Sequence, residues 1–220
     1  MARNSYAVFG VGSFGSKLAL ALVAGGNAVL VCDRDAARID ELRDKVDDAL
    51  IGDVSNEETI RELNVAKFDA VILGMSSYFE DQVLALTLLK QFGARKVIVK
   101  SGSPIQERIL YRLGADEVIQ VDLDVATRLA RRLSLANIAD IFEFKGSAIA
   151  DVSTPAELAG RPLRELDLRN KYNITILIIR DASGVNERAI GPETVLSEGD
   201  QLTVFGDQQT IIELFKGKSK

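Results

Sequence analysis

The first 120 residues alternate short runs of β-branched and aliphatic residues with longer stretches of helical periodicity. This alternation is typical of βαβ units, whose connecting helices bury both faces of a parallel sheet. Six strands are expected, at residues 6–11, 28–32, 48–51, 70–73, 96–99 and 117–121. Helices are expected between them, at 13–24, 36–46, 57–63, 80–92 and 104–113. The pattern predicts an α/β fold built on a Rossmann-like, doubly wound parallel sheet.

The pattern changes after residue 123. Apolar residues at helical spacing, among them Val125, Leu129 and Leu133, predict a connecting helix over 124–140. Further on, strands are expected at 142–144, 149–152, 174–179, 188–190 and 201–205, and helices at 155–158, 163–172 and 207–215. We therefore expect a Rossmann-like domain at 1–123, the connecting helix at 124–140 and a small α+β domain at 141–220.

The composition excludes several classes of function. The chain has 27 basic and 32 acidic side chains, and neither half carries a net positive charge, so no nucleic-acid partner is expected. No apolar run approaches the roughly 18 to 20 residues that cross a bilayer. The single cysteine, Cys32, and the lack of signal-peptide features at the start favour the reducing cytoplasm.

A glycine motif, Gly10-Val-Gly12-Ser13-Phe14-Gly15, directly follows the first expected strand and opens the first helix. In that context Gly10 permits a tight turn, Gly12 lets the backbone approach a pyrophosphate, and Gly15 allows close helix–strand packing. The helix N-terminus adds free N–H groups and a positive dipole end. The motif alone is weak evidence for nucleotide binding, because glycines also occur in ordinary turns.

An acidic residue at the end of the second strand strengthens this interpretation. Asp33 stands where a carboxylate accepts hydrogen bonds from the ribose hydroxyls of a dinucleotide. Its charge would repel a 2′-phosphate and so disfavours NADP. The neighbouring Arg34 weakens that exclusion, since it can pair with a phosphate or simply be a solvated turn residue. The motif and Asp33 together predict binding of a dinucleotide or adenine nucleotide.

Other polar or small residues follow later strands, at the edge where open α/β sheets bind ligands. Asp53 either reaches an adenine amino group or caps the next helix. The segment Gly74-Met75-Ser76-Ser77 either lets a ribose or phosphate approach the backbone or forms a simple loop. Lys100 either offers a positive charge to a phosphate or lies on the surface.

A proton-transfer group for catalysis is hard to find in this chain. It has no histidine, and none of its four tyrosines is followed four residues later by a lysine. Cys32 lies inside a strand and is more typical of a buried residue than of a nucleophile. We therefore expect a sensor rather than an enzyme. The alternative is a small NAD-dependent oxidoreductase that takes catalytic groups from a partner chain.

Several segments together resemble a known family. In the first half they are Tyr6-Ala-Val-Phe-Gly-Val-Gly-Ser-Phe-Gly15, Val31-Cys-Asp33, Ile51-Gly-Asp53, Phe68-Asp-Ala-Val-Ile72, Val99-Lys100 and Leu113-Gly-Ala-Asp116. In the second half they are Leu163-Arg-Glu-Leu-Asp-Leu-Arg-Asn-Lys-Tyr-Asn-Ile174 and Val195-Leu-Ser-Glu-Gly-Asp-Gln-Leu202. Over essentially its whole length the chain resembles the Ktr/Trk regulatory subunits of bacterial potassium uptake, with an RCK (KTN) domain followed by an RCK-C (TrkA-C) domain.

The resemblance implies a cytoplasmic gating subunit at the inner face of the membrane. Such subunits form dimers that assemble into an octameric ring beneath a separate, membrane-embedded potassium translocation subunit. ATP, ADP, NAD or NADH bound in the Rossmann cleft shifts the shape of the ring. The helix at 124–140 is then expected to pack against a partner subunit. RCK modules also serve other membrane systems, so a nucleotide-sensing regulator of a different transporter remains an alternative.

Three details of the resemblance concern individual residues. Several Ktr members carry an arginine at the fourth position of the glycine motif that reaches a γ-phosphate, whereas this chain has Ser13. Many carry a glutamate after the sixth strand that helps to hold a divalent cation at the dimer interface, and the matching residue here is Asp122. Some relatives bind cyclic di-AMP in the C-terminal domain, where Asp167, Arg169 and Lys171 fall in the matching segment.

Overall fold

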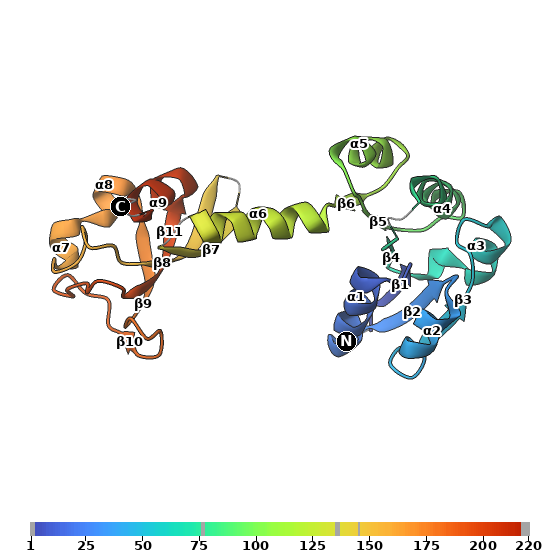
Figure 1. Cartoon of the computed structure of the whole chain (residues 1–220), viewed down its shortest axis with the longest axis horizontal. Helices are drawn as coiled ribbons and strands as arrows, with labels where there is room; N and C mark the ends of the chain where they lie inside the picture. The colour runs from blue at the N-terminus through green and yellow to red at the C-terminus, as the bar shows by residue number, and fades with distance from the viewer. Residues whose placement is uncertain (1–2, 76–77, 135–136, 145, 217–220) are drawn as a thin grey trace. The chain divides into compact units, whose positions relative to one another are not determined.

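The computed structural model describes residues 3–75, 78–134, 137–144 and 146–216. The chain divides into two compact units, residues 1–123 and 124–220. Figure 1 draws the first unit in blue to green and the second in yellow-green to red. Among the described residues, no helix combines the length and apolar character needed to cross a bilayer.

The first unit is a parallel sheet of six strands in the order β3-β2-β1-β4-β5-β6. Its strands are β1 (Ser5–Phe9), β2 (Ala28–Asp33), β3 (Asp48–Ile51), β4 (Ala70–Leu73), β5 (Val97–Lys100) and β6 (Glu117–Ile119). Its helices are α1 (Ser13–Ala24), α2 (Ala36–Leu42), α3 (Glu57–Leu63), the 3-10 turn η1 (Val65–Lys67), α4 (Phe79–Gln91) and α5 (Pro104–Arg112). The strand order reverses between β1 and β4, which creates a crevice at their carboxyl ends.

Alternate residues of the strands feed two separate apolar cores. Val8 of β1 packs with Ala19 of α1 and Ile39 of α2 on one face of the sheet. Phe9, the next residue, packs on the other face with the core that includes side chains of α3, α4 and α5. The sheet is therefore covered on both faces, and the predicted Rossmann-like fold is confirmed.

The second unit contains an antiparallel five-stranded sheet in the order β10-β9-β11-β8-β7. Its strands are β7 (Ile138–Phe144), β8 (Ser147–Ser153), β9 (Thr175–Arg180), β10 (Glu187–Arg188) and β11 (Gln201–Asp207). Its helices are α7 (Leu163–Leu166), α8 (Leu168–Tyr172) and α9 (Gln208–Phe215), whereas α6 (Val121–Ser134) runs across the boundary between the units. Buried residues of β8 and β11 pack against Ile211 and Phe215 of α9, as expected for a small α+β domain.

The structure differs from the expected helix at 124–140. Helix α6 begins earlier, at Val121, and ends at Ser134, while Ile138 already belongs to β7. Strand β7 pairs with β8 from Ile138 to Phe144. Ile138 and Ile141 are three residues apart, a spacing typical of a helix, yet both reach one core in the strand because the register of β7 shifts between Ile138 and Asp140.

Of two other expected helices, one is absent and one is interrupted. Residues 155–158 form turns, because Leu158 N–H donates to the carbonyl of Pro155. The expected helix at 163–172 is broken at Asp167, whose φ is +48°. Leu166 and Leu168 are both buried, and residues two apart point to opposite sides of a continuous helix. The left-handed residue between them lets both reach the core.

Candidate nucleotide-binding site

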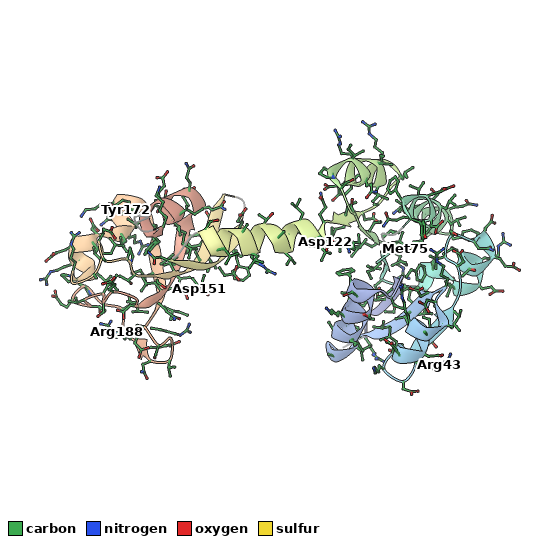
Figure 2. The ribbon with its side chains drawn as sticks, viewed as in Figure 1. Arg43, Met75, Asp122, Asp151, Tyr172 and Arg188 are labelled. Atoms are coloured by element: carbon green, nitrogen blue, oxygen red, sulfur yellow. The ribbon has the colours of Figure 1, made fainter. Side chains whose placement is uncertain are left out.

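The crevice at the reversal of strand order holds a cavity of about 310 Å³. Loops that follow the first five strands line it. Ten of the predicted residues come together there, namely Gly10, Gly12, Ser13, Phe14, Asp33, Arg34, Asp53, Gly74, Met75 and Lys100. Predicted Ser76 lies outside the described residues, and Met75 beside it is labelled in Figure 2.

The turn after β1 depends on three glycines in close contact. Gly10 has φ +84° and donates its N–H to the carbonyl of Cys32 at 2.8 Å. A Cβ on Gly15 would lie 2.1 Å from the Gly10 carbonyl oxygen, and one on Gly74 would lie 2.8 Å from the same atom. Gly15 therefore lies behind the cavity, where it lets α1 approach the turn.

Gly12 has a different environment. The nearest neighbour of a Cβ built on it would be Nη1 of Arg38, at 3.9 Å. Gly12 is also the N-cap residue of α1, and no side chain caps the first turn. The backbone here faces the cavity with the unpaired N–H groups of a 12-residue helix, an arrangement suited to a phosphate or pyrophosphate.

Asp33 is buried, with an exposed fraction of 7%. One carboxylate oxygen accepts the N–H of Val11 at 2.8 Å, and the other accepts the N–H of Asp35 at 2.9 Å. Nη1 of Arg38 lies 3.6 Å from the first oxygen. Each oxygen keeps further lone-pair capacity, so the carboxylate can hold the turn and still accept a ribose hydroxyl.

Asp53, after β3, accepts hydrogen bonds from the hydroxyl and the N–H of Ser55 at 2.7 and 2.9 Å. These bonds lower the pKa of the Asp53 carboxyl, against the effect of burial, and the charge of Arg34 lowers it further. Asn56, not Asp53, caps α3 by accepting the N–H of Glu58. The capping alternative for Asp53 is therefore wrong, and its ionised carboxylate borders the cavity.

Arg34 extends from the end of β2 toward the start of α4. Its Nη1 lies 3.3 Å from a carboxylate oxygen of Asp81, and its guanidinium lies 5.1 Å from the ring centroid of Tyr78. Both Arg34 and Tyr78 line the cavity. The pair places a cation, which can bind a phosphate, and an aromatic ring, which can stack on a base, at the same wall of the cavity.

Lys100 ends β5, and its side chain is only 14% exposed. Its Nζ lies 3.4 Å from a carboxylate oxygen of Asp122 and 6.0 Å from the ring centroid of Phe14. The surface alternative for Lys100 is therefore wrong. Its carbonyl accepts a hydrogen bond from Gln82 Nε2 at 2.6 Å, and the same nitrogen donates to the carbonyl of Met75.

Sequence reasoning missed several residues of this region. Five more residues line the cavity, namely Cys32, Arg38, Gly52, Val54 and Tyr78. Buried Gln82 holds the ends of β4 and β5 together from α4. Arg38 could have been found from the sequence, because it lies close after Asp33, in the first turn of α2. Tyr78 and Gln82 could not, because their positions depend on how α4 packs.

Asp122 does not line the cavity, and its side chain is 85% exposed. Figure 2 labels it at the start of α6. Within the described ranges, no group of three or more acidic, cysteine or histidine side chains is placed to hold a metal ion. The fold of one chain thus supplies a single carboxylate at the position expected for a cation ligand.

Two domain families match the chain. The TrkA-N domain matches residues 6–121 and the TrkA-C domain matches residues 148–216. The chain is 29% identical over 205 residues to Ktr system potassium uptake protein C of Bacillus subtilis, covering 93% of this chain and 92% of that one. It is 27% identical over 214 residues to Ktr system potassium uptake protein A of Vibrio alginolyticus, covering 97% of each.

A solved structure shows the same fold. The GsuK channel bound to NAD is similar with a TM-score of 0.65 and 18% identity, over the whole of this chain and 40% of that one. The two domain families occur in the order that the sequence motifs indicated, and together they span most of the chain. The resemblance seen in the sequence is confirmed: this chain belongs to the Ktr/Trk family of potassium-uptake regulatory proteins, with a TrkA-N and a TrkA-C domain.

Proposed function

We propose that this protein is the nucleotide-sensing regulatory subunit of a potassium-uptake system and controls a separate membrane-embedded translocation subunit. The observation that carries the proposal is the cavity at the strand reversal, where the uncapped N-terminus of α1 and the buried carboxylate of Asp33 line one space. The relatives named as potassium uptake proteins supply the physiological context. The protein then works in the cytoplasm, held at the membrane by its partner.

The ligand is an adenine nucleotide, ATP or ADP, or NAD(H). The N–H groups after Gly12 would bind the phosphates, and Asp33 would accept hydrogen bonds from the ribose. The wall that contains Asp53 would contact the base. The solved GsuK channel bound to NAD supports a dinucleotide in this fold. Ser13 supplies no charge to a third phosphate, whereas Lys100 does.

The subunit acts by binding rather than by catalysis. The chain has no histidine, and burial, together with the charges of Asp33 and Asp53, raises the pKa of the Cys32 thiol to about 12. That thiol is protonated near neutral pH and is a poor nucleophile. A sensor needs only a difference in ligand affinity between two conformations, which such a cavity can provide.

Two apolar helix faces support assembly into a ring of dimers. Val125, Leu129 and Leu133 follow one another at intervals of four on α6 and are 43 to 76% exposed. Ile105 and Ile109 make a second exposed pair on α5. A closed octamer built from four dimers needs two different contacts, and α6 and α5 would each supply one.

Two further ligands belong to the same proposal. In a dimer, Asp122 would contribute one carboxylate to a divalent cation whose remaining ligands come from the nucleotide or the partner. In the C-terminal domain, exposed Arg169 and Lys171 on α8 would meet the phosphates of cyclic di-AMP. Equilibrium dialysis with radiolabelled cyclic di-AMP tests the second site, and retention that Arg169→Gln leaves unchanged would remove it from the proposal.

The first experiment is calorimetric titration of the purified protein with ATP, ADP, NAD and NADH, each with and without magnesium. Light scattering follows the oligomer in parallel. The proposal predicts saturable binding of at least one ligand and a ligand-dependent change in the octamer. A monomer that binds none of the four would contradict it. Potassium uptake by cells that express the protein with and without a Ktr translocation subunit then tests regulation.

A further inference from the structure

We propose that the ion pair between Lys100 and Asp122 is a charge-sensitive switch, in which a ligand phosphate reaching the end of β5 takes Lys100 away from Asp122. The inference rests on the proposed function, because it requires a nucleotide in the cavity. In this inference Asp122 competes with the ligand phosphate for Lys100. The first turn of α6 therefore responds to the charge of the bound nucleotide.

The position of Lys100 is the first part of the argument. Its side chain is largely buried, lines the cavity and points toward the start of α1, as the 6.0 Å separation from the Phe14 ring shows. Gln82 fixes its backbone through a 2.6 Å hydrogen bond to the carbonyl. The ammonium group is thus held near the place where the helix N-terminus favours a phosphate.

The weakness of its present partner is the second part. The side chain of Asp122 is 85% exposed, and its contact with Lys100 is 3.4 Å long. An ion pair with one fully hydrated carboxylate contributes little, because water screens that end and the flexible Asp122 side chain must be ordered. A phosphate carries more charge and offers several acceptor oxygens, so it outcompetes the carboxylate for the same ammonium group.

The place of Asp122 in the fold gives the exchange a consequence. Asp122 is the second residue of α6, the helix that continues from the first unit into the second. A phosphate bound at Lys100 would take Lys100 away from Asp122 and would also repel the Asp122 carboxylate. A ligand whose far end is neutral, such as the nicotinamide of NADH, would leave the pair intact. Ligand charge and the conformation of this turn are then thermodynamically linked.

The test compares ATP with NADH in EDTA for the wild type and for Asp122→Asn. Removing the competing carboxylate is expected to tighten ATP binding about two- to fivefold, the range of an exposed ion pair, and to change NADH binding less than twofold. Asp124→Asn is the matched control, since it removes the same charge two residues further along α6 and is expected to change neither affinity.

A second variant completes a double-mutant cycle. Lys100→Gln is expected to weaken ATP binding about tenfold, because a charge-assisted contact is lost. In that background Asp122→Asn is expected to have no further effect on ATP, since the pair no longer exists. This loss of coupling is a result that a merely structural role of either residue would not produce.

The outcomes separate the inference from the function on which it rests. If the wild type binds ATP or NADH but Asp122→Asn leaves ATP affinity unchanged, the switch is wrong and the nucleotide site stands. If Asp122→Asn weakens ATP binding in EDTA, the carboxylate assists the phosphate, and the switch is again wrong. Weaker ATP binding in magnesium alone would instead report the cation role proposed for Asp122, and the EDTA comparison still decides the switch. If the wild type binds no nucleotide, the proposed function falls and the switch falls with it.

Discussion

The carboxylate of Asp33 and the backbone N–H of Val11 are joined by a hydrogen bond of 2.8 Å, although the residues are 22 positions apart in the chain. The bond connects the end of β2 to the turn that follows β1. The other carboxylate oxygen accepts the N–H of Asp35, so one buried side chain shapes two loops of the cavity. The acid at this position therefore has a structural role besides its proposed contact with ribose.

Replacement of Asp33 by alanine is expected to lower both stability and ligand affinity. Two N–H donors would lose their acceptor, which costs about 2 to 4 kcal/mol of unfolding free energy. Adenine-nucleotide binding is expected to weaken by about 1 to 3 kcal/mol, since ribose hydroxyls would be left unpaired. Urea unfolding and calorimetric titration measure the two effects, and Asp33→Asn, which keeps one acceptor oxygen, provides a milder variant.

Asp35→Asn is the control for this prediction. Asp35 caps α2 by accepting the N–H of Ala37, and asparagine caps equally well. Asp35 does not line the cavity, so nucleotide affinity is expected to stay the same. Unaltered affinity in a folded Asp33→Ala protein would remove the ribose contact from the proposal.

Two alanine substitutions in the glycine motif are expected to act in different ways. Gly12→Ala places a methyl group in open space beside the cavity, with the nearest neighbour 3.9 Å away, and its φ of −64° suits alanine. Stability is expected to be unchanged and nucleotide affinity to fall about tenfold or more, because the backbone can no longer approach a phosphate.

Gly15→Ala is expected to act mainly on stability rather than on nucleotide affinity. Its methyl group would lie 2.1 Å from the Gly10 carbonyl oxygen, so the turn must move. We expect a loss of about 1 to 3 kcal/mol in unfolding free energy. Thermal and urea unfolding of both variants, followed by titration with nucleotide, checks the contrast. Equal stability of the two variants would contradict it.

Acid destabilises the first unit partly through Asp47. The N–H of Val29 donates to its carboxylate at 2.9 Å and holds the pKa of Asp47 below its ordinary value of 3.8, with Arg3 assisting. Because the folded-state pKa is the lower one, this contribution is present above pH 3.8 and disappears as the pH falls through the lowered pKa.

Asp47→Asn is therefore expected to lower the unfolding free energy by about 1 kcal/mol at pH 7. The difference from wild type is expected to shrink as the pH falls below about 4 and Asp47 becomes protonated. Urea midpoints recorded from pH 7 to pH 3 measure this convergence. Asp48→Asn changes the neighbouring exposed carboxyl and is expected to leave the midpoints close to wild type throughout.

Gln82 is expected to be important for the shape of the cavity. Gln82→Leu would leave the carbonyls of Met75 and Lys100 without their donor and is expected to cost about 1 to 3 kcal/mol of unfolding free energy. Nucleotide affinity is expected to fall as well, because both carbonyls belong to residues that line the cavity. Gln91→Leu makes the same change at an exposed position of α4 and serves as the matched control.

The apolar face of α6 gives a prediction about assembly. A charge on Leu129, which is 43% exposed, is expected to oppose burial of this face against another copy. Leu129→Asp is expected to reduce the molar mass measured by light scattering, whereas Thr127→Asp, on a different side of the same helix, is expected to preserve it. An unchanged mass for Leu129→Asp would exclude this face as the contact.

Much of the first unit could be predicted because its signals are local. The glycine motif, the strand-ending Asp33 and the expected helix at 13–24 all depend on neighbours within one element, and α1 covers the expected residues. Where an irregular strand mimics helical spacing, as at Ile138 and Ile141, local reasoning was wrong about the helix end. The break at Asp167 likewise required knowledge of which leucines the core buries.

The sequence by itself determined the order of strands and helices, the turn that opens the crevice and most of the residues around it, because backbone geometry follows from nearby side chains. Only the tertiary structure decided which distant groups meet there. The position of Tyr78 under Arg34 and the pairing of Lys100 with Asp122 depend on side-chain direction and on how helices pack on the sheet. Such contacts join elements far apart in the chain, and no local pattern encodes the distance between them.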